Sequence, residues 1–357
     1  MLFTSEQVSG GHPDKIADQI SDAIVTDCMQ NDLHSRVAVE TLIKDNHVIV
    51  GGEITSKHEP NIQELVRKVL FQREPAITYD FDLTTHISKQ SPDIALGTAD
   101  DVGGAGDQGS VFGFACSETR KMLPLPFVLA TEAIQELEQM RSPLLLPDAK
   151  SQCTYDYKKR RIDTFLISTQ HREDADPKDV QLICTRVMMK IANAYGLNTD
   201  FRVLVNPTGR FVTGGSFGDT GVTGRKIIAD TYGGMARHGG GAFSGKDPTK
   251  VDRSAAYAAR RIAKDVLRAG LAKKVEIQLS YAIGVAEPVS ITVNTFHTGR
   301  APASYISRWI RKRYDLTPAG IIDFLGLLHV DYTYTSVYGH FWRQWMPWED
   351  ESRPYGK

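Results

Sequence analysis

The chain has 357 residues, of which 41% are hydrophobic and 24% are charged, and its formal net charge is −1. A chain of this length buries a large core and is expected to form two or three domains. The near-zero charge excludes nucleic acid or an anionic membrane as an expected bulk partner, and no stretch approaches the roughly 20 apolar residues of a membrane span.

The N-terminus and the cysteines indicate a cytoplasmic protein. Residues 1–6 lack the basic region and apolar run of a secretory signal. Cys28, Cys116, Cys153 and Cys184 are scattered without metal or redox spacing. We therefore expect reduced, packed thiols and a cytoplasmic location.

A glycine-containing turn precedes the first predicted helix. Residues 10–15 read Gly-Gly-His-Pro-Asp-Lys, and apolar residues then recur at helical spacing. His12 can donate to a phosphate or a leaving oxygen, and Asp14 can bind Mg²⁺ through oxygen. A histidine before proline is also a common capping or turn residue, so this motif alone leaves both interpretations open.

Two alternating strands follow, over residues 36–43 and 48–55, and then a helix near 62–72. Glu40 and Glu53 lie within these apolar strands. A carboxylate inside an apolar strand is costly unless it is paired or coordinated, so we expect a ligand, an ion or a lysine beside each.

Residues 88–109 are rich in Gly, Asp and small residues, which predicts a long mobile loop that is either a lid or an ordinary linker. The central region then has an apolar stretch and predicted helices and strands at 111–115, 127–140, 162–168, 177–195 and 201–205. The basic run 158–161 is interpreted as a solvated hairpin turn.

A second set of glycines spans residues 207–226, and a third precedes the predicted helix of the last region. Residues 239–252 read Gly-Gly-Gly-Ala-Phe-Ser-Gly-Lys-Asp-Pro-Thr-Lys-Val-Asp. Such glycines let backbone N–H groups approach an anion. We expect Asp247 to cap a helix that starts at Pro248, with Lys250 and Asp252 in its first turn. A phosphate site is favoured over a connecting turn.

This loop is not predicted to be a P-loop. Asp247 follows Lys246 where a magnesium-binding Ser or Thr would stand, and no apolar strand leads into the glycines. Strands at 275–283 and 289–296, a helix at 302–314 and an aromatic tail at 332–348 complete the region. We expect the tail to pack against the body or a partner chain and not to form a binding box. One-sided helices and paired strands predict an α+β fold.

The candidate site residues fall into two chemical classes. The cations are His12, Lys150, Arg225, Lys226, Lys246 and Lys250, and the candidate oxygen ligands are Asp14, Glu40, Asp107 and Asp252. This combination suits a polyphosphate bridged by hard cations, while Glu53 and Asp107 could hold an ammonium-bearing second substrate. The residues by themselves indicate a nucleotide-dependent transferase or hydrolase.

Several longer motifs stand out, namely Gly11-His12-Pro13-Asp14-Lys15, Gly51-Gly52-Glu53-Ile54-Thr55, Gly104-Ala105-Gly106-Asp107-Gln108-Gly109, Pro147-Asp148-Ala149-Lys150-Ser151-Gln152, Asn206-Pro207-Thr208-Gly209-Arg210-Phe211 and the stretch 239–260. On these motifs the chain resembles S-adenosylmethionine synthetases. The resemblance implies three similar two-layer α+β domains around a pseudo-threefold axis. It implies domains at 1–90, 106–213 and 214–357, with an active-site loop at 91–105. It also implies a homodimer, or a dimer of dimers, with active sites at the subunit interface.

The resemblance further implies a reaction and its residues. Methionine sulfur attacks C5′ of ATP, and the expelled triphosphate is hydrolysed to phosphate and pyrophosphate. The implied catalytic residues are His12, Lys150, Arg225, Lys246 and Lys250. The implied ATP-binding residues are His12, Asp148, Lys150, Phe211, Asp219, Arg225, Lys226, Ala242 and Lys246. The implied methionine-binding residues are Glu53, Gln90, Asp107, Asp219, Lys250 and Ile283. Asp14 and Asp252 would hold two Mg²⁺ ions, and Glu40 would hold K⁺.

Three departures from the family pattern stand out. Gly10 occupies a position that is usually Glu, the segment 71–83 is short, and the loop after Gln90 is trimmed. We therefore expect retained chemistry with altered closure or oligomer packing. The alternatives are a catalytically silent nucleotide-binding subunit, which would be expected to lose His12, Lys246 or the magnesium carboxylates, and a tripolyphosphatase without methionine transfer.

Overall fold

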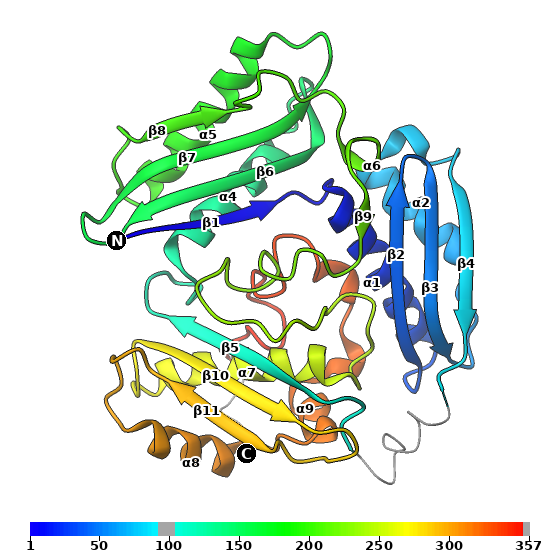
Figure 1. Cartoon of the computed structure of the whole chain (residues 1–357), viewed down its shortest axis with the longest axis vertical. Coiled ribbons are helices and arrows are strands. Elements are labelled where there is room, and N and C mark those ends of the chain that lie inside the picture. The colour runs from blue at the N-terminus through cyan, green and yellow to red at the C-terminus, as the bar shows by residue number, and fades with distance from the viewer. Residues whose placement is uncertain (92–103, 353–357) are drawn as a thin grey trace.

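The computed structural model describes residues 1–91 and 104–352, which form three β-sheets with helices packed against them (Figure 1). Three units repeat one order of elements: a leading strand, a buried helix, an antiparallel hairpin and a second helix. The first unit comprises β1 (Leu2–Val8), α1 (Pro13–Asn31), β2 (Arg36–Lys44), β3 (His47–Thr55) and α2 (Ile62–Arg73), followed by η1 (Pro75–Ile77) and β4 (Asp82–Ser88).

The other two units follow the same order. The second comprises β5 (Gly109–Cys116), α4 (Leu125–Met140), β6 (Leu145–Asp156), β7 (Arg161–His171) and α5 (Pro177–Ala194), followed by β8 (Arg202–Val205). The third comprises α6 (Gly215–Gly218), β9 (Gly221–Val222), α7 (Val251–Arg268), β10 (Lys274–Tyr281), β11 (Ser290–Asn294) and α8 (Ala303–Arg313). After it come α9 (Pro318–Leu325), η2 (Leu327–His329) and η3 (Tyr332–Tyr334).

Each leading strand joins the sheet of the following unit. β1 pairs antiparallel with β6, β5 with β10, and β9 with β2, so the exchange closes on itself around the molecule. This cyclic arrangement confirms the predicted α+β fold with three similar units about a pseudo-threefold axis (Figure 1). The sheets therefore do not follow the expected sequence boundaries, because each contains a strand from outside its own stretch of chain. The expected loop at 91–105 lies mostly outside the described residues.

The three units share their hydrophobic interior unequally. One core runs through α1, the hairpin β2–β3, α7 and β10 and into the C-terminal segment, whereas α4, β7 and α5 enclose a separate core. All four cysteines are buried and free, as predicted. None of the helices in the described part combines the length and apolar character that a membrane crossing requires.

The expected start of the helix after the glycine-rich loop is wrong by three residues. α7 begins at Val251 with Lys250 as its N-cap, and Asp247 lies outside it. The buried Asp247 carboxylate instead accepts from the backbone N–H of Val37 at 2.7 Å and of Thr249 at 2.9 Å. Its oxygens are used to fasten a turn to β2, so the helix starts after that turn. Gly270, at φ 69°, lies just beyond the C-cap of the helix, where glycine is favoured.

The expected cost of placing Glu40 and Glu53 inside apolar strands does not arise. Both side chains are exposed, because they alternate with the buried valines of β2 and β3 and point away from the core. The predicted hairpin turn at 158–161 is confirmed between β6 and β7. The tail packs on the body through Trp342 and Trp348, while Trp345 is 61% exposed.

Candidate functional site

The turn before α1 places His12 and Asp14 at the helix N-terminus. His12 is the N-cap, and its Nδ1 accepts the backbone N–H of Asp14 at 3.2 Å. Pro13 follows at the first helical position, where its missing N–H removes no helical hydrogen bond. The capping and functional interpretations of His12 are therefore compatible, since capping uses only one ring nitrogen.

Burial and three neighbouring lysines, with Lys226 and Lys150 foremost, lower the pKa of His12 to about 3. The imidazole is thus neutral at physiological pH. Because Nδ1 accepts a hydrogen bond, the proton resides on Nε2, which is left as a donor. His12 can donate a neutral hydrogen bond to a ligand oxygen.

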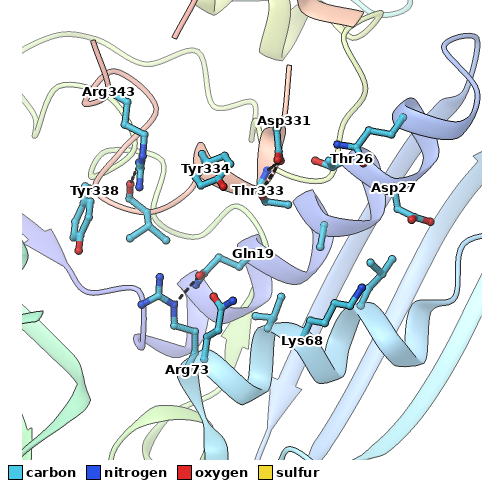
Figure 2. A pocket seen from close by; sticks show the side chains of 16 residues that line it. Gln19, Thr26, Asp27, Lys68, Arg73, Asp331, Thr333, Tyr334, Tyr338 and Arg343 are labelled. Carbon is cyan, nitrogen blue, oxygen red and sulfur yellow. Dashed lines mark hydrogen bonds between the residues drawn. The ribbon is translucent and has the colours of Figure 1, made fainter. Parts of the chain in front are cut away.

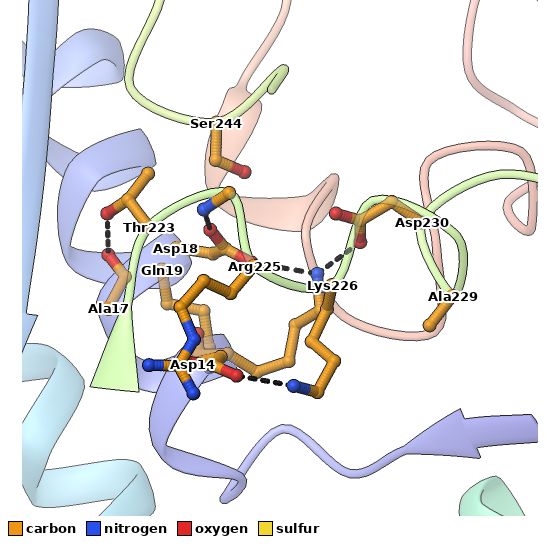
Figure 3. A network of polar contacts seen from close by, with 12 residues as sticks. Asp14, Ala17, Asp18, Gln19, Thr223, Arg225, Lys226, Ala229, Asp230 and Ser244 are labelled. Atoms are coloured by element: carbon orange, nitrogen blue, oxygen red, sulfur yellow. Dashed lines mark hydrogen bonds and ion pairs between the residues drawn. The ribbon is translucent and has the colours of Figure 1, made fainter. Parts of the chain in front are cut away.

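Asp14 is fully buried and lies at the centre of a set of cations (Figure 3). One carboxylate oxygen accepts from Val222 N at 2.9 Å and lies 3.2 Å from Arg225 Nε, and the other pairs with Lys226 Nζ. The strand β9 and the residues after it thus bring Arg225 and Lys226 to the start of α1. Together with Asp148, Lys150 and Asp219, whose charges act on His12 or on one another, these residues form what we call the His12 group.

Asp148 on β6 supplies an orphan acceptor to this group. It is 6% exposed, its Oδ2 accepts from Gly215 N at 2.9 Å, and its Oδ1 has no partner among the described residues. Burial raises the pKa of Asp148 to about 6. A buried oxygen without a partner is costly, so a donor from a ligand would be well placed here.

Phe211 is held by a hydrogen bond from its N–H to His171 Nε2 at 3.1 Å.

The glycine-rich loop runs along the edge of β2. Val39 N donates to Gly245 O at 2.9 Å and Asp247 N to Val37 O at 3.0 Å, so this part of the loop extends the sheet beyond β9. At the start of α7, Lys246 Nζ lies 2.6 Å from Asp252 Oδ2. A Cβ on Gly241 would come within 2.2 Å of the Asp252 carboxylate, so a larger residue there would displace that carboxylate. The loop thus carries a lysine and a carboxylate at a helix N-terminus.

The sheet register adds Glu53 to the same face. Ala38 lies opposite Glu53 of β3 and also opposite Lys246, so these three side chains share one row on the outer face of the sheet. Gln90 lies near the C-terminal end of β3, because the Gln90 N–H donates to Thr55 Oγ1 at 3.1 Å. We call Glu53, Gln90, Asp107, Lys246, Lys250 and Asp252 the Lys246 group.

The remaining predicted residues are placed less tightly. Asp107 is exposed and precedes Gly109, which lies against Asp252. Ile283 is 56% exposed and bridges to Ala105. Lys250 pairs with the Asp247 carboxylate. Glu40 lies on the outer face of β2 and belongs to no group of three or more possible metal ligands among the described residues.

Within the part of the chain that the structure describes, no hydrogen bond or ion pair joins the His12 group to the Lys246 group. The chain segments of the two groups approach each other where Gly224 faces Ala242, whose methyl would lie 2.5 Å from a Cβ at position 224. The predicted residues therefore form two separate sets in one chain.

Single carboxylates fit magnesium here only if a ligand supplies the other oxygens. No group of three or more His, Cys, Asp or Glu suited to a metal occurs among the described residues. Asp14 and Asp252 each face a lysine, so each already holds a cation against one carboxylate. Mg²⁺ commonly binds one or two carboxylates together with substrate phosphates, and this arrangement suits that mode.

Several buried charges behind the site were not predicted. Lys15 pairs with Asp18 at 2.9 Å and with Asp230, and Asp18 accepts from Gly224 N at 2.8 Å (Figure 3). Asp22 binds Arg253 at 2.7 Å and Gly245 N at 3.0 Å. Asp14, Asp18 and Asp22 are spaced by four residues and so lie on one face of α1. This spacing was the sequence signal for the buried charges.

The departure at Gly10 is accommodated by Arg73 and Glu138. A Cβ on residue 10 would lie 2.6 Å from the Arg73 guanidinium carbon. Glu138 Oε1 accepts from Gly10 N at 3.0 Å, and its Oε2 is 3.8 Å from Arg73. Arg73 also lines a cavity of about 550 Å³ between α1, α2 and the C-terminal segment, which contains none of the predicted site residues (Figure 2).

Comparison with known proteins gives one consistent result. Family models for the N-terminal, central and C-terminal domains of S-adenosylmethionine synthetase match residues 1–95, 102–211 and 213–350. A relative from Salinibacter ruber (strain DSM 13855 / M31), an S-adenosylmethionine synthase, is 48% identical over 367 residues, which cover 98% of this chain and 95% of the relative.

Proposed function

The chain belongs to the S-adenosylmethionine synthetase family, and we propose how its two residue groups carry out the synthesis of S-adenosylmethionine. In this reaction the sulfur of methionine attacks C5′ of ATP. The S–C5′ bond forms as the C5′–O bond breaks, and the bonding electrons leave with the triphosphate. The triphosphate is then hydrolysed to phosphate and pyrophosphate.

The His12 group binds the ATP and its leaving group. The neutral His12 donates from Nε2 to the oxygen that gains charge when the C5′–O bond breaks, while Lys150, Arg225 and Lys226 face the phosphates. Such preorganised donors stabilise developing charge without having to reorganise. Phe211 lies against the adenine, Asp219 accepts from the ribose or from the methionine ammonium, and Asp148 offers its unpartnered oxygen to the nucleotide.

The Lys246 group completes the phosphate site and holds methionine. Lys246, Lys250 and the backbone near Ala242 contact the phosphates. Glu53, Gln90, Asp107 and Ile283 hold methionine so that its sulfur is aligned with C5′, and this alignment supplies a large effective concentration. No side-chain nucleophile is required.

Asp14 and Asp252 would each hold one Mg²⁺ ion, with the triphosphate providing the other oxygens. The ions would supply charge neutralisation on the leaving group. Glu40 would contribute to a K⁺ site, and its exposure means that other oxygens must come from a partner chain. Both metal assignments are proposals for this chain.

Because the two groups are not joined within one chain, we infer that the His12 group of one subunit faces the Lys246 group of another. A homodimer provides two such sites by symmetry, and dimers could pair further. The observation that carries the proposal is that each group sets a carboxylate against a cation at a glycine-rich turn. The enzyme acts in the cytoplasm in this account.

The proposal is tested by incubating the protein with ATP, Mg²⁺ and K⁺, with and without L-methionine, and resolving the products. We expect S-adenosylmethionine with equal phosphate and pyrophosphate, only when methionine is present. Phosphate release without methionine would instead identify a tripolyphosphatase, and bound but unreacted ATP would identify a silent subunit. The silent subunit is not favoured, because His12, Lys246 and both carboxylates are retained.

A further inference from the structure

Glu74 is a buried carboxylate in the segment where the chain departs from its family. It is 9% exposed and lies between α2 and η1. Its Oε2 accepts from the backbone N–H of Ser216 at 3.0 Å. Gly215 has φ 58°, and a Cβ there would come within 2.4 Å of the Glu74 carboxylate, so the close approach depends on glycine. The contact therefore depends both on the Glu74 carboxylate and on the glycine at position 215.

Glu74 and Asp148 hold neighbouring amides of one turn. Asp148 accepts from Gly215 N and Glu74 from Ser216 N, so two carboxylates from different units fasten consecutive residues. Burial, with a smaller contribution from Asp148, raises the pKa of Glu74 to about 7. Placing the Glu74 carboxylate close to the Asp148 carboxylate is electrostatically unfavourable. We therefore expect the pair to serve a function in the site.

This turn connects the residues that the proposed function assigns to the nucleotide. Phe211 precedes it by four residues, and Asp219 follows directly as the C-cap of α6, with its N–H bonded to Gly215 O at 3.2 Å. The chain then enters β9, where Val222 N binds Asp14. Figure 1 shows α6 between the sheet that contains β6 and the sheet that contains β2. The turn is thus bound by residues of the first and second units, and it determines how the chain runs from Phe211 to the strand that contacts Asp14.

We propose that Glu74 is a positioning residue for ATP, which fixes the turn at residues 215–216 so that Asp148, Phe211 and Asp219 face the nucleotide together. The proposal rests on the proposed function of the His12 group. The short segment 71–83 would then not only alter closure of the active site. It would also place the Glu74 carboxylate beside the residues that bind the nucleotide. Glu74 itself touches no substrate in this account.

The test is a steady-state comparison of the E74A, E74Q and E64A variants of the full-length enzyme with the unchanged protein. We expect E74A to raise the KM for ATP about tenfold, with kcat changed less than about threefold and the KM for methionine unchanged. E74Q keeps an oxygen that can accept from Ser216 N, so it should restore the KM for ATP to within about threefold. E64A is the control, because Glu64 is on α2 and partly exposed.

Two results would overturn the proposal. One is an unchanged KM for ATP in a folded E74A protein, and the other is an equal loss in kcat and in both KM values that E74Q fails to restore. Activity of the unchanged protein is measured in the same assay, so failure of the proposed function would be seen separately, as absence of S-adenosylmethionine.

Discussion

One hydrogen bond, from the backbone N–H of Asp14 to His12 Nδ1, determines that the imidazole can donate from Nε2. The backbone N–H of Asp14 occupies Nδ1, and burial beside Lys226 and Lys150 keeps the ring neutral. Sequence alone identified His12, Asp14, Lys226 and Lys246 as candidates, because glycine turns, a helix start and charged residues are visible in the pattern. It could not identify Glu74 or the partners of Lys15, since these contacts join positions far apart in the chain.

We predict that H12A loses about 10²–10³ in kcat, because one preorganised donor to the leaving oxygen is removed. The pH dependence of kcat/KM should keep its shape, since a residue with a pKa of about 3 does not titrate near neutrality. H47A, at an exposed histidine on β3, is the control. A limb near pH 6.5 that disappears in H12A would show a cationic His12 instead.

Glu74 makes a prediction for stability against pH. Its folded pKa of about 7 lies above the ordinary 4.5, so the folded state binds this proton more tightly and its contribution to stability is lost as the pH rises through about 7. E74Q lacks this loss. Relative to the unchanged protein, E74Q should gain about 1–3 kcal/mol between about pH 5 and pH 8 in denaturant unfolding. A constant difference across that range, like that expected for E64Q, would contradict the assignment.

At the scale of elements, helices and hairpins with clear periodicity were predicted, whereas their partners were not. The apolar face of α7 is buried as expected, but its opposite face is buried too, with Arg253, Arg260 and Lys264 nearly inaccessible. Period alone marks a polar face as exposed, and only the tertiary structure supplies the carboxylates that cover it. Glu40 and Glu53 show the same limit: their alternation with apolar residues is visible in the sequence, but only the structure shows that both side chains are exposed.

The docking of the C-terminal segment on α7 is predicted to depend on Glu349. This buried side chain accepts from Arg260 Nε at 2.7 Å and Lys264 Nζ at 2.9 Å. E349A removes the buried carboxylate that pairs with both cations, so we expect a loss of about 3–5 kcal/mol and a fall in Tm on the order of 10 °C. E351A removes a partly exposed partner of Lys264 and should change stability by less than about 1 kcal/mol. Similar Tm values for both variants would refute this account.

At the scale of the whole molecule, the exchange of leading strands explains why the site is divided. The α+β class followed from the order of elements, but the pairing of β9 with β2 did not, because strands of two residues carry no sequence signal. That pairing brings Arg225 and Lys226 to Asp14, while the loop after it fastens Lys246 to the other end of β2. One chain thus presents two groups, and the proposed function requires a second copy to join them.

The most direct test of this account is subunit complementation. D14N inactivates the His12 group, and K246A inactivates the Lys246 group. Each homodimer should be nearly inactive, but co-refolded mixtures should regain about a quarter of the unchanged activity, because half the dimers are mixed and each has one intact site. Native mass spectrometry would verify mixed dimers. If mixed dimers form and synthesis of S-adenosylmethionine stays absent, the two groups act within one chain and the central claim fails.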